Sequence, residues 1–382
     1  MKKVVFVTTV SQSLVFFNGA CKVLQDSCDI TMVSNFEGCT SIKNKKSVGE
    51  KYHIKFHRRI NLLGDIISLF QLIILLVRLK PDMIHSMTPK AGLLSMVAGK
   101  FARVPIRIHT FTGLIFPTQT GFKRRILVLM DRITCMCATK IIPEGNGVKN
   151  DLLNSNITSK ELRVVGNGNV SGIDTEFFSN CIFSDDLKNS LKCRYKISND
   201  DIVLVFVGRL VGDKGVNELV ESFVLLSKKH LNIKLLLVGP RELEDPISSS
   251  TISTINNSPN IIEVGWQKDI RPFLAISDIF VLPSYREGFP NAVLQAGSMG
   301  LPSIVTDING CNEIIVHNEN GVIVPAKSVD ALSNACDKLI NDLNLRSYLA
   351  SNSRRMIITR FEQTFVRSEM RKMYEEQFEI NN

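Results

Sequence analysis

The sequence lacks the cysteine spacings that mark small secreted proteins and zinc-binding proteins. Its nine cysteines are an odd number, and no two of them stand in a Cys-x-x-Cys pair. A disulfide scaffold would be shorter and richer in cysteine, and a zinc knuckle needs a different spacing. We therefore expect reduced thiols that fill buried apolar space in a cytoplasmic protein.

Metal-binding patterns are missing as well, and we expect a buried strand in place of a signal peptide at the start of the sequence. Asp185 and Asp186 form an acidic pair with no third ligand nearby, and the five histidines other than His109 show no ligand set. The apolar run after Met1 is broken at once by Thr8 and Thr9, before any cleavage site. The sequence predicts no bound metal and a buried first strand.

Aromatic residues are few, at 7% with one tryptophan, although the net charge is +9. Residues 1–165 hold 24 Lys and Arg against 10 Asp and Glu, whereas residues 166–382 hold 22 against 27. Such asymmetry indicates that the first half faces something anionic. Without stacking aromatics or a binding motif, nucleic acid is disfavoured. Lipid head groups and a phosphorylated substrate remain.

The chain of 382 residues is long enough for two domains. Short apolar runs alternate with longer helical patterns, which predicts parallel sheets built from βαβ units. The expected strands are 3–10, 29–35, 81–87, 106–113 and 140–145 in the first half, then 201–210, 233–239, 260–265, 279–284 and 302–307. The fold class is therefore α/β, with two Rossmann-like, doubly wound domains.

The domain boundaries follow from composition. The turn-rich stretch after residue 166, with the polar SDDLKNS of 184–190, is typical of a linker. We expect domains at 1–180 and 181–355. A single last helix, from about residue 354 to 378, is expected to cross back so that 356–382 joins the first domain.

Residues 60–77, INLLGDIISLFQLIILLV, have nearly the length of a membrane span. Polar Asn61, Asp65, Ser68 and Gln71 disfavour a span, leaving a helix packed on the sheet or one lying in the membrane interface. The basic neighbours favouring the interface are Arg58, Arg59, Arg78 and Lys80. A second basic cluster, 123–125, follows Phe122 and fits an anionic membrane surface or a solvated helix start.

The richest motif is LPSYREGFPNAV, residues 282–293. A strand ends in a loop that presents Glu287, and a helix begins with Pro290 in its first turn. Backbone amides and the helix dipole at this end favour a phosphate, and Gly288 lets the backbone approach it. Glu287 would accept hydrogen bonds from sugar hydroxyls.

A second motif, VGRLVGDKG at 207–215, delivers two cations to the carboxyl end of a strand. After Gly208, Arg209 can bind two phosphate oxygens at once, and Lys214 adds a point charge. In open α/β sheets, ligands bind at this edge. One diphosphate would explain both motifs.

Together with HTFTG, NGNV-x-GID and TDINGCNEI, these motifs resemble glycosyltransferase family 4, the retaining enzymes of GT-B fold, over nearly the whole chain. More narrowly, they resemble enzymes that extend polyprenyl-diphosphate-linked saccharides for O-antigen, capsule or glycoprotein glycans. The resemblance implies a metal-independent hexosyltransferase without a cofactor. Its donor would be a nucleotide diphosphate sugar, with UDP as the default.

The resemblance also assigns roles. Arg209 and Lys214 would hold the donor diphosphate, and Glu287 would contact the donor sugar. His109 would face the reacting carbon across an interdomain cleft. The distal phosphate would lie at the backbone of Gly288, Phe289, Pro290 and Asn291, where every residue except the proline offers an N–H group.

Two departures stand out. The family places a second Glu eight positions after the first, on the nucleotide ribose, where this chain has Gln295; we expect altered nucleotide affinity and retained activity. The first loop lacks the family's paired glycines and has TTVSQSLVFFNG instead, so that Phe16 and Phe17 are expected to meet lipid or acceptor.

The sequence thus predicts a retaining transferase, with Arg209, Lys214, Glu287 and His109 as catalytic residues. It would work on a polyprenyl-diphosphate-linked acceptor, in peripheral contact with the inner face of the plasma membrane. A sugar-nucleotide epimerase of the same fold would not need a basic membrane face. A non-catalytic nucleotide-sugar-binding subunit, suggested by Gln295, would tolerate loss of Arg209.

Overall fold

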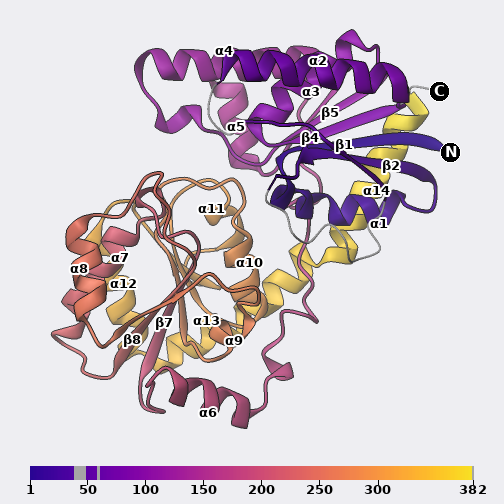
Figure 1. Ribbon diagram of the computed structural model, residues 1–382. Coiled ribbons are helices and arrows are strands. Elements are labelled where there is room, and N and C mark those ends of the chain that lie inside the picture. The colour runs from indigo at the N-terminus through magenta and orange to yellow at the C-terminus, as the bar shows by residue number, and fades with distance from the viewer. Residues whose placement is uncertain (38–48, 58–60, 381–382) are drawn as a thin grey trace. The chain divides into compact units, whose positions relative to one another are not determined.

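A computed structural model describes residues 1–37, 49–57 and 61–380 of the chain. The chain divides into two compact units, shown in Figure 1: Met1–Gly172 with Gln363–Asn382, and Ile173–Glu362. The sequence predicted boundaries after residues 180 and 355. The observed boundaries follow Gly172 and Glu362, several residues away from each. Arg58 and Arg59, expected beside the apolar helix, lie outside the described residues.

The first unit is built on a parallel sheet of six strands in the order β3-β2-β1-β4-β5-β6. The central strand β1 buries Val4 to Val7 without alternation, as expected for a strand covered on both faces. The sequence missed β3, because this short edge strand, EKYH, carries no apolar run. The strands are β1 (Lys2–Val10), β2 (Cys28–Asn35), β3 (Glu50–His53), β4 (Met83–Met87), β5 (Ile106–Phe111) and β6 (Lys140–Pro143).

Helices cover both faces of this sheet, and each face has its own core. One core is closed by α2 (Leu62–Leu79), α3 (Pro89–Phe101), α4 (Gly121–Cys137) and α5 (Asn146–Asn154). The other is closed by α1 (Asn18–Leu24) and α14 (Gln363–Ile380). Phe17 is fully buried in this second core, stacked 4.4 Å from Phe6, so the expectation that it meets lipid or acceptor is wrong.

The second unit repeats the plan, with strands in the order β12-β11-β10-β7-β8-β9. Its strands are β7 (Ile202–Val207), β8 (Ile233–Val238), β9 (Ile261–Gly265), β10 (Ile279–Leu282), β11 (Ser303–Thr306) and β12 (Gly321–Val324), of which the sequence missed the short edge strand β12. Its helices are α6 (Asp185–Arg194), α7 (Val216–Ser227), α8 (Ser249–Asn257), α9 (Arg271–Ala275), α10 (Asn291–Ser298), α11 (Cys311–Ile314), α12 (Val329–Asn341) and α13 (Leu343–Phe361).

The polar stretch expected to be a linker forms the ten-residue helix α6 instead. The Ser184 side chain caps it by accepting a hydrogen bond from the Leu187 amide at 3.3 Å. Asp185 and Asp186 lie in its first turn, where carboxylates interact favourably with the helix dipole. The acidic pair is therefore explained by its place in the first turn of a helix.

The expected single last helix is also wrong, because Glu362 leaves the helical conformation, with ψ at 139°, and separates α13 from α14. Just before this break, the carbonyl of Phe361 accepts a hydrogen bond from the Ile173 amide at 2.9 Å. Ile173 and Glu362 pair as an isolated parallel bridge. The chain therefore crosses between the units at two neighbouring points.

Candidate active site

In each sheet the direction of the strand order reverses beside a central strand, between β1 and β4 and between β7 and β10. In open α/β sheets, such a switch point leaves a crevice at the carboxyl ends of the two strands, where ligands bind. In the second unit, β7 leads into Gly208 and Arg209, and β10 leads into the loop that carries Glu287. Both sequence motifs therefore meet at one switch point.

Lys214 and Glu287 form the centre of this site. The Lys214 ammonium lies 2.5 Å from Oε1 of Glu287, and both side chains are largely buried. Ser284, fully buried, donates a hydrogen bond to the same oxygen at 2.8 Å. The carboxylate is thus held by a cation and a hydroxyl. Sequence reasoning assigned no role to Ser284, although it stands three residues before Glu287.

A glycine fixes the turn that carries Lys214. Gly215 has φ of +68°, and an added Cβ would lie 2.0 Å from the Pro283 carbonyl oxygen. A side chain at this position is excluded both by conformation and by space. The turn is therefore pressed against the end of β10, which brings Lys214 to the Glu287 loop.

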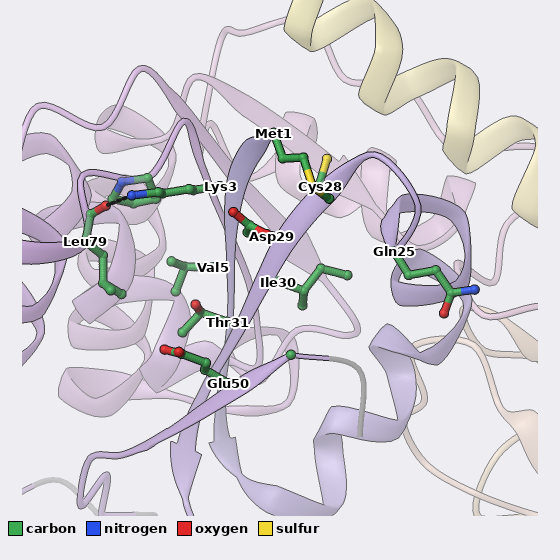
Figure 2. A pocket seen from close by; sticks show the side chains of 12 residues that line it. Met1, Lys3, Val5, Gln25, Cys28, Asp29, Ile30, Thr31, Glu50 and Leu79 are labelled. Atoms are coloured by element: carbon green, nitrogen blue, oxygen red, sulfur yellow. Dashed lines mark hydrogen bonds between the residues drawn. The ribbon is translucent and has the colours of Figure 1, made fainter. Parts of the chain in front are cut away.

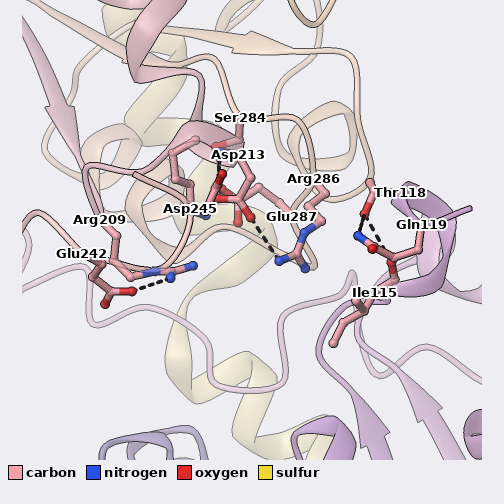
Figure 3. Close-up of polar contacts among 11 residues, drawn as sticks. Ile115, Thr118, Gln119, Arg209, Asp213, Glu242, Asp245, Ser284, Arg286 and Glu287 are labelled. Carbon is pink, nitrogen blue, oxygen red and sulfur yellow. Dashed lines mark hydrogen bonds and ion pairs between the residues drawn. The ribbon is translucent and has the colours of Figure 1, made fainter. Parts of the chain in front are cut away.

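Arg209 lies at the same edge, paired with Glu242 at 2.9 Å and partly exposed (Figure 3). Burial lowers the pKa of its guanidinium, but the hydrogen bond and charge of Glu242, together with the charges of Asp213 and Glu287, outweigh this and raise the pKa overall. Arg209 therefore remains a cation whose field reaches the Lys214–Glu287 pair.

The loop between β10 and α10 is braced by further polar contacts. Arg286 donates to Asp213 at 3.0 Å, as Figure 3 shows, and the Tyr285 amide donates to the Asp213 carbonyl at 2.8 Å. The Tyr285 hydroxyl donates to Glu218 in the first turn of α7. These contacts hold the Glu287 loop against the loop of Lys214, and sequence reasoning missed them because they join distant segments.

Helix α10 begins one residue later than expected, since Pro290 is its N-cap and not part of its first turn. Within the described part of the chain, no side chain caps this end by a hydrogen bond. Gly288 contacts the following loop closely, because a Cβ on Gly310 would lie 2.2 Å from its carbonyl oxygen. Phe289 is buried in the core, and Asn291 is the first helical residue.

Gln295 lines a pocket of about 500 Å³ in the same unit. The pocket lies beside Val207, the last residue of β7, and the segment 268–271 at the start of α9. Phe177 and Phe178 form another wall, and the Arg271 guanidinium lies 3.4 Å over the Phe177 ring. The pocket thus has both aromatic and charged side chains in its lining, next to the carboxyl end of β7.

A hollow of about 730 Å³ in the first unit lies at the opposite edge of its sheet, at the amino ends of the strands (Figure 2). It is lined by residues at the amino ends of β1, β2 and β3, among them Lys3, Asp29 and Glu50. Ligands of open α/β sheets bind at the carboxyl ends. Its place in the fold therefore sets this hollow apart from the predicted site.

His109 lies on β5, and its side chain is 1% exposed. Its Nδ1 is 3.0 Å from the Ser86 hydroxyl, and helix α3 lies so close that a Cβ on Gly92 would be 2.2 Å from its ring. Burial lowers the pKa of His109 to about 3, against a smaller raising effect of Ser86. The imidazole is therefore neutral at physiological pH.

No group of three or more His, Cys, Asp or Glu side chains with the geometry of a metal site occurs within 1–37, 49–57 and 61–380. The pattern of the site is instead one of paired cations and carboxylates beside a helix start. Such a pattern suits a diphosphate carried by a hydroxylated group.

Comparison with known proteins decides the family. A model of glycosyl transferases group 1 matches residues 188–356, and one of a glycosyl transferase 4-like domain matches 48–168. Over 377 residues the chain is 34% identical to the capsular polysaccharide biosynthesis glycosyltransferase CapM of Staphylococcus aureus, covering 98% of this chain and 97% of that protein. The chain belongs to the group 1 glycosyl transferases.

A second relative of this transferase is an Escherichia coli enzyme named UDP-Gal:alpha-D-GlcNAc-diphosphoundecaprenol alpha-1,3-galactosyltransferase. The two are 29% identical over 308 residues, 80% of this chain and 78% of that one. Among solved structures, Anabaena HepE in complex with UDP and glucose has the same fold, with a TM-score of 0.81, 16% identity and coverage of 98% and 100%. The predicted family and GT-B fold are confirmed.

Proposed function

We propose that this transferase moves a hexosyl or N-acetylhexosaminyl residue from a UDP-sugar to a saccharide carried on a polyprenyl diphosphate, in the assembly of a capsule or O-antigen type glycan. The observation that carries the proposal is the Lys214–Glu287 pair at the switch point, beside the start of α10. The names of the relatives supply the substrate class, since the Escherichia coli enzyme is named for a UDP-sugar donor and a diphosphoundecaprenol acceptor.

The donor would extend over three parts of the second unit. Arg209 and Lys214 would bind the diphosphate, whose distal phosphate would also accept hydrogen bonds from amides between Gly288 and Asn291. Glu287, held by Ser284, would accept hydrogen bonds from sugar hydroxyls. The pocket that Gln295 lines would take the nucleoside.

The proposed reaction retains the configuration of the sugar. The bond between the anomeric carbon and the diphosphate oxygen breaks, and a bond to the acceptor oxygen forms on the same face. The proton of the acceptor hydroxyl passes to the leaving diphosphate oxygen. Arg209 and Lys214 stabilise the charge that develops there.

The proposed acceptor also implies where in the cell the protein works. A polyprenyl diphosphate is anchored in the plasma membrane, while nucleotide sugars are cytoplasmic. The transferase would therefore work at the inner face of that membrane, and the basic first half of the chain would approach an anionic leaflet.

Purified protein, incubated with membranes and radiolabelled UDP- and GDP-sugars in turn, tests the proposal. We expect label from one UDP-sugar in the lipid extract, with the anomeric configuration of the donor kept in the product. Interconversion of the free donor without lipid label would indicate an epimerase. Normal glycan output in cells that carry Arg209→Ala would indicate a non-catalytic subunit.

A further inference from the structure

Helix α2 has two apolar flanks, and one of them is uncovered. The inner flank buries Ser68, Leu72 and Leu76 against the first unit. The outer flank follows helical spacing and is formed by large apolar residues that are all exposed by half or more: Leu63, Ile66, Ile67, Phe70, Ile74 and Val77. A soluble helix normally presents polar residues outward. A continuous exposed apolar stripe marks an interaction surface.

The same helix is firmly part of its unit. The Ser68 hydroxyl donates to the Lys55 and Gly64 carbonyls, and Asp65 forms an ion pair of 2.8 Å with the buried ammonium of Lys90 on α3. Although α2 is long and apolar enough to cross a membrane, these contacts would be lost in a span. The helix therefore lies along the unit, with its outer flank free for a partner.

Helix α4 adds charge to this surface. Like α2, it packs on α3 in the helical layer on the same face of the sheet (Figure 1). Its exposed stripe alternates large apolar and basic residues: Phe122, Arg125, Leu129, Arg132 and Met136. Lys123 and Arg124 extend the charge at its start, and the helix carries four basic residues against one carboxylate.

We propose that the outer stripes of α2 and α4 form a membrane-docking surface that takes an anionic bilayer, with α2 lying in the plane of the interface. The proposal deepens the proposed function and rests on its lipid-linked acceptor. Aliphatic and phenylalanine side chains would enter the acyl boundary, while Lys123, Arg124 and Arg125 would contact anionic head groups. This alternation of apolar and cationic residues complements an anionic lipid surface better than it would a second copy of itself.

Docking would also fix the position of the predicted acceptor-binding edge of the first unit relative to the bilayer. Asp65 on α2 binds Lys90, which stands at the start of α3, and α3 contacts the His109 ring through Gly92. The bilayer surface is thereby joined to the carboxyl edge of the first sheet through one buried ion pair. Asp65 and Lys90 are positioning residues in this scheme.

Flotation of the full-length protein with lipid vesicles tests the surface. We expect binding to vesicles of phosphatidylcholine mixed with phosphatidylglycerol, and weak binding to phosphatidylcholine alone. The triple variant Ile67→Gln, Phe70→Gln, Ile74→Gln should weaken binding about tenfold or more on both. The triple variant Lys123→Gln, Arg124→Gln, Arg125→Gln should lose about a hundredfold on the anionic vesicles only.

Matched control variants come from exposed positions of the second unit. Leu231→Gln with Leu243→Gln removes two highly exposed leucines, and Arg194→Glu with Lys228→Glu removes two exposed cations. Both controls should bind vesicles as the wild type does. An equal loss of vesicle binding in the controls would overturn the proposal. It would also be overturned if the wild type does not bind vesicles but forms dimers, and the α2 triple variant is monomeric.

Two further readouts separate this inference from others. Alkaline carbonate should release the protein from cell membranes, because an interfacial helix is extracted and a span is retained; retention would overturn the in-plane placement. UDP binding, measured by calorimetry on the same variants, should be unchanged. If the wild type binds UDP but no vesicles, the proposed docking surface is wrong and the proposed function stands. If it binds vesicles but not UDP, the proposed function is wrong.

Discussion

The ammonium of Lys214 lies 2.5 Å from the carboxylate of Glu287, although 73 positions separate them in the chain. One residue follows β7 and the other follows β10, the two strands that flank the switch point of the second sheet. Opposite charges held this close, in a largely buried setting, leave a cation ready to bind a phosphate and a carboxylate ready to bind hydroxyls.

Loss of either site cation should reduce turnover strongly. We expect Lys214→Ala and Arg209→Ala each to lower kcat/KM for the UDP-sugar by roughly 30- to 1000-fold, because each removes about 2–4 kcal/mol of stabilisation at the departing diphosphate. Steady-state kinetics with lipid acceptor measures this. Lys228 is an exposed cation of the same unit, so Lys228→Ala is the control and should leave kcat and KM unchanged.

Glu287→Gln should separate sugar recognition from diphosphate binding. The amide keeps the shape of the side chain but removes the charge that pairs with Lys214 and the acceptor strength that sugar hydroxyls need. We expect kcat to fall roughly 100-fold or more, while the affinity for UDP, which carries no sugar, is kept or improved.

Calorimetric titration with UDP and turnover with the full donor distinguish the two effects. Glu221→Gln, an exposed glutamate of α7, is the matched control. If Glu287→Gln lowers the affinity for UDP by as large a factor as it lowers kcat, Glu287 does not act through contacts with the donor sugar.

How much of this site the sequence predicted depends on the range of the interactions. The motifs around Arg209, Lys214 and Glu287 were visible because each is contiguous, and the structure brings Lys214 and Glu287 into contact. The contacts of Tyr285 with Glu218 and of Arg286 with Asp213 join segments roughly seventy residues apart. Local pattern carries no signal for such pairs.

Each error in the predicted fold has its own physical reason. Polar composition suggested a linker at 184–190, but Ser184 followed by two aspartates is also a helix start, and capping decided the outcome. The break at Glu362 contains neither Pro nor Gly. It coincides with the pairing of Ile173 with Phe361 and Glu362, a contact between distant segments that local sequence does not show. The edge strand β3, EKYH, carries no apolar run, and the four residues of β12 were not assigned to a strand.

Gln295 should tune nucleotide affinity without controlling chemistry. Its amide lines the proposed nucleoside pocket about one helical turn from the start of α10. We expect Gln295→Ala to raise KM for the UDP-sugar about three- to tenfold with kcat within about twofold, since one neutral hydrogen bond is lost. Gln295→Glu should recover the wild-type KM or improve it. A hundredfold fall in kcat in either variant would contradict this assignment.

Acid should destabilise the first unit through its buried histidines. His85 is fully buried between the Tyr374 hydroxyl and the Thr110 hydroxyl, at 2.8 Å from each. Burial, with a smaller effect of His109, lowers the pKa of His85 to about 3 from its ordinary 6.5. Between these values the unfolded chain binds a proton that the folded chain excludes, so the free energy of unfolding falls as pH falls below 6.5.

Each such histidine contributes ~1.4 kcal/mol per pH unit in that window. Between pH 6.5 and about 5, the fall in unfolding free energy should therefore be ~2 kcal/mol smaller in His85→Gln than in the wild type, even though the variant is less stable at neutral pH. Urea unfolding monitored at several pH values measures the difference. An unchanged slope in His85→Gln would mean that His85 binds a proton as readily in the folded chain as in the unfolded chain, which contradicts the prediction.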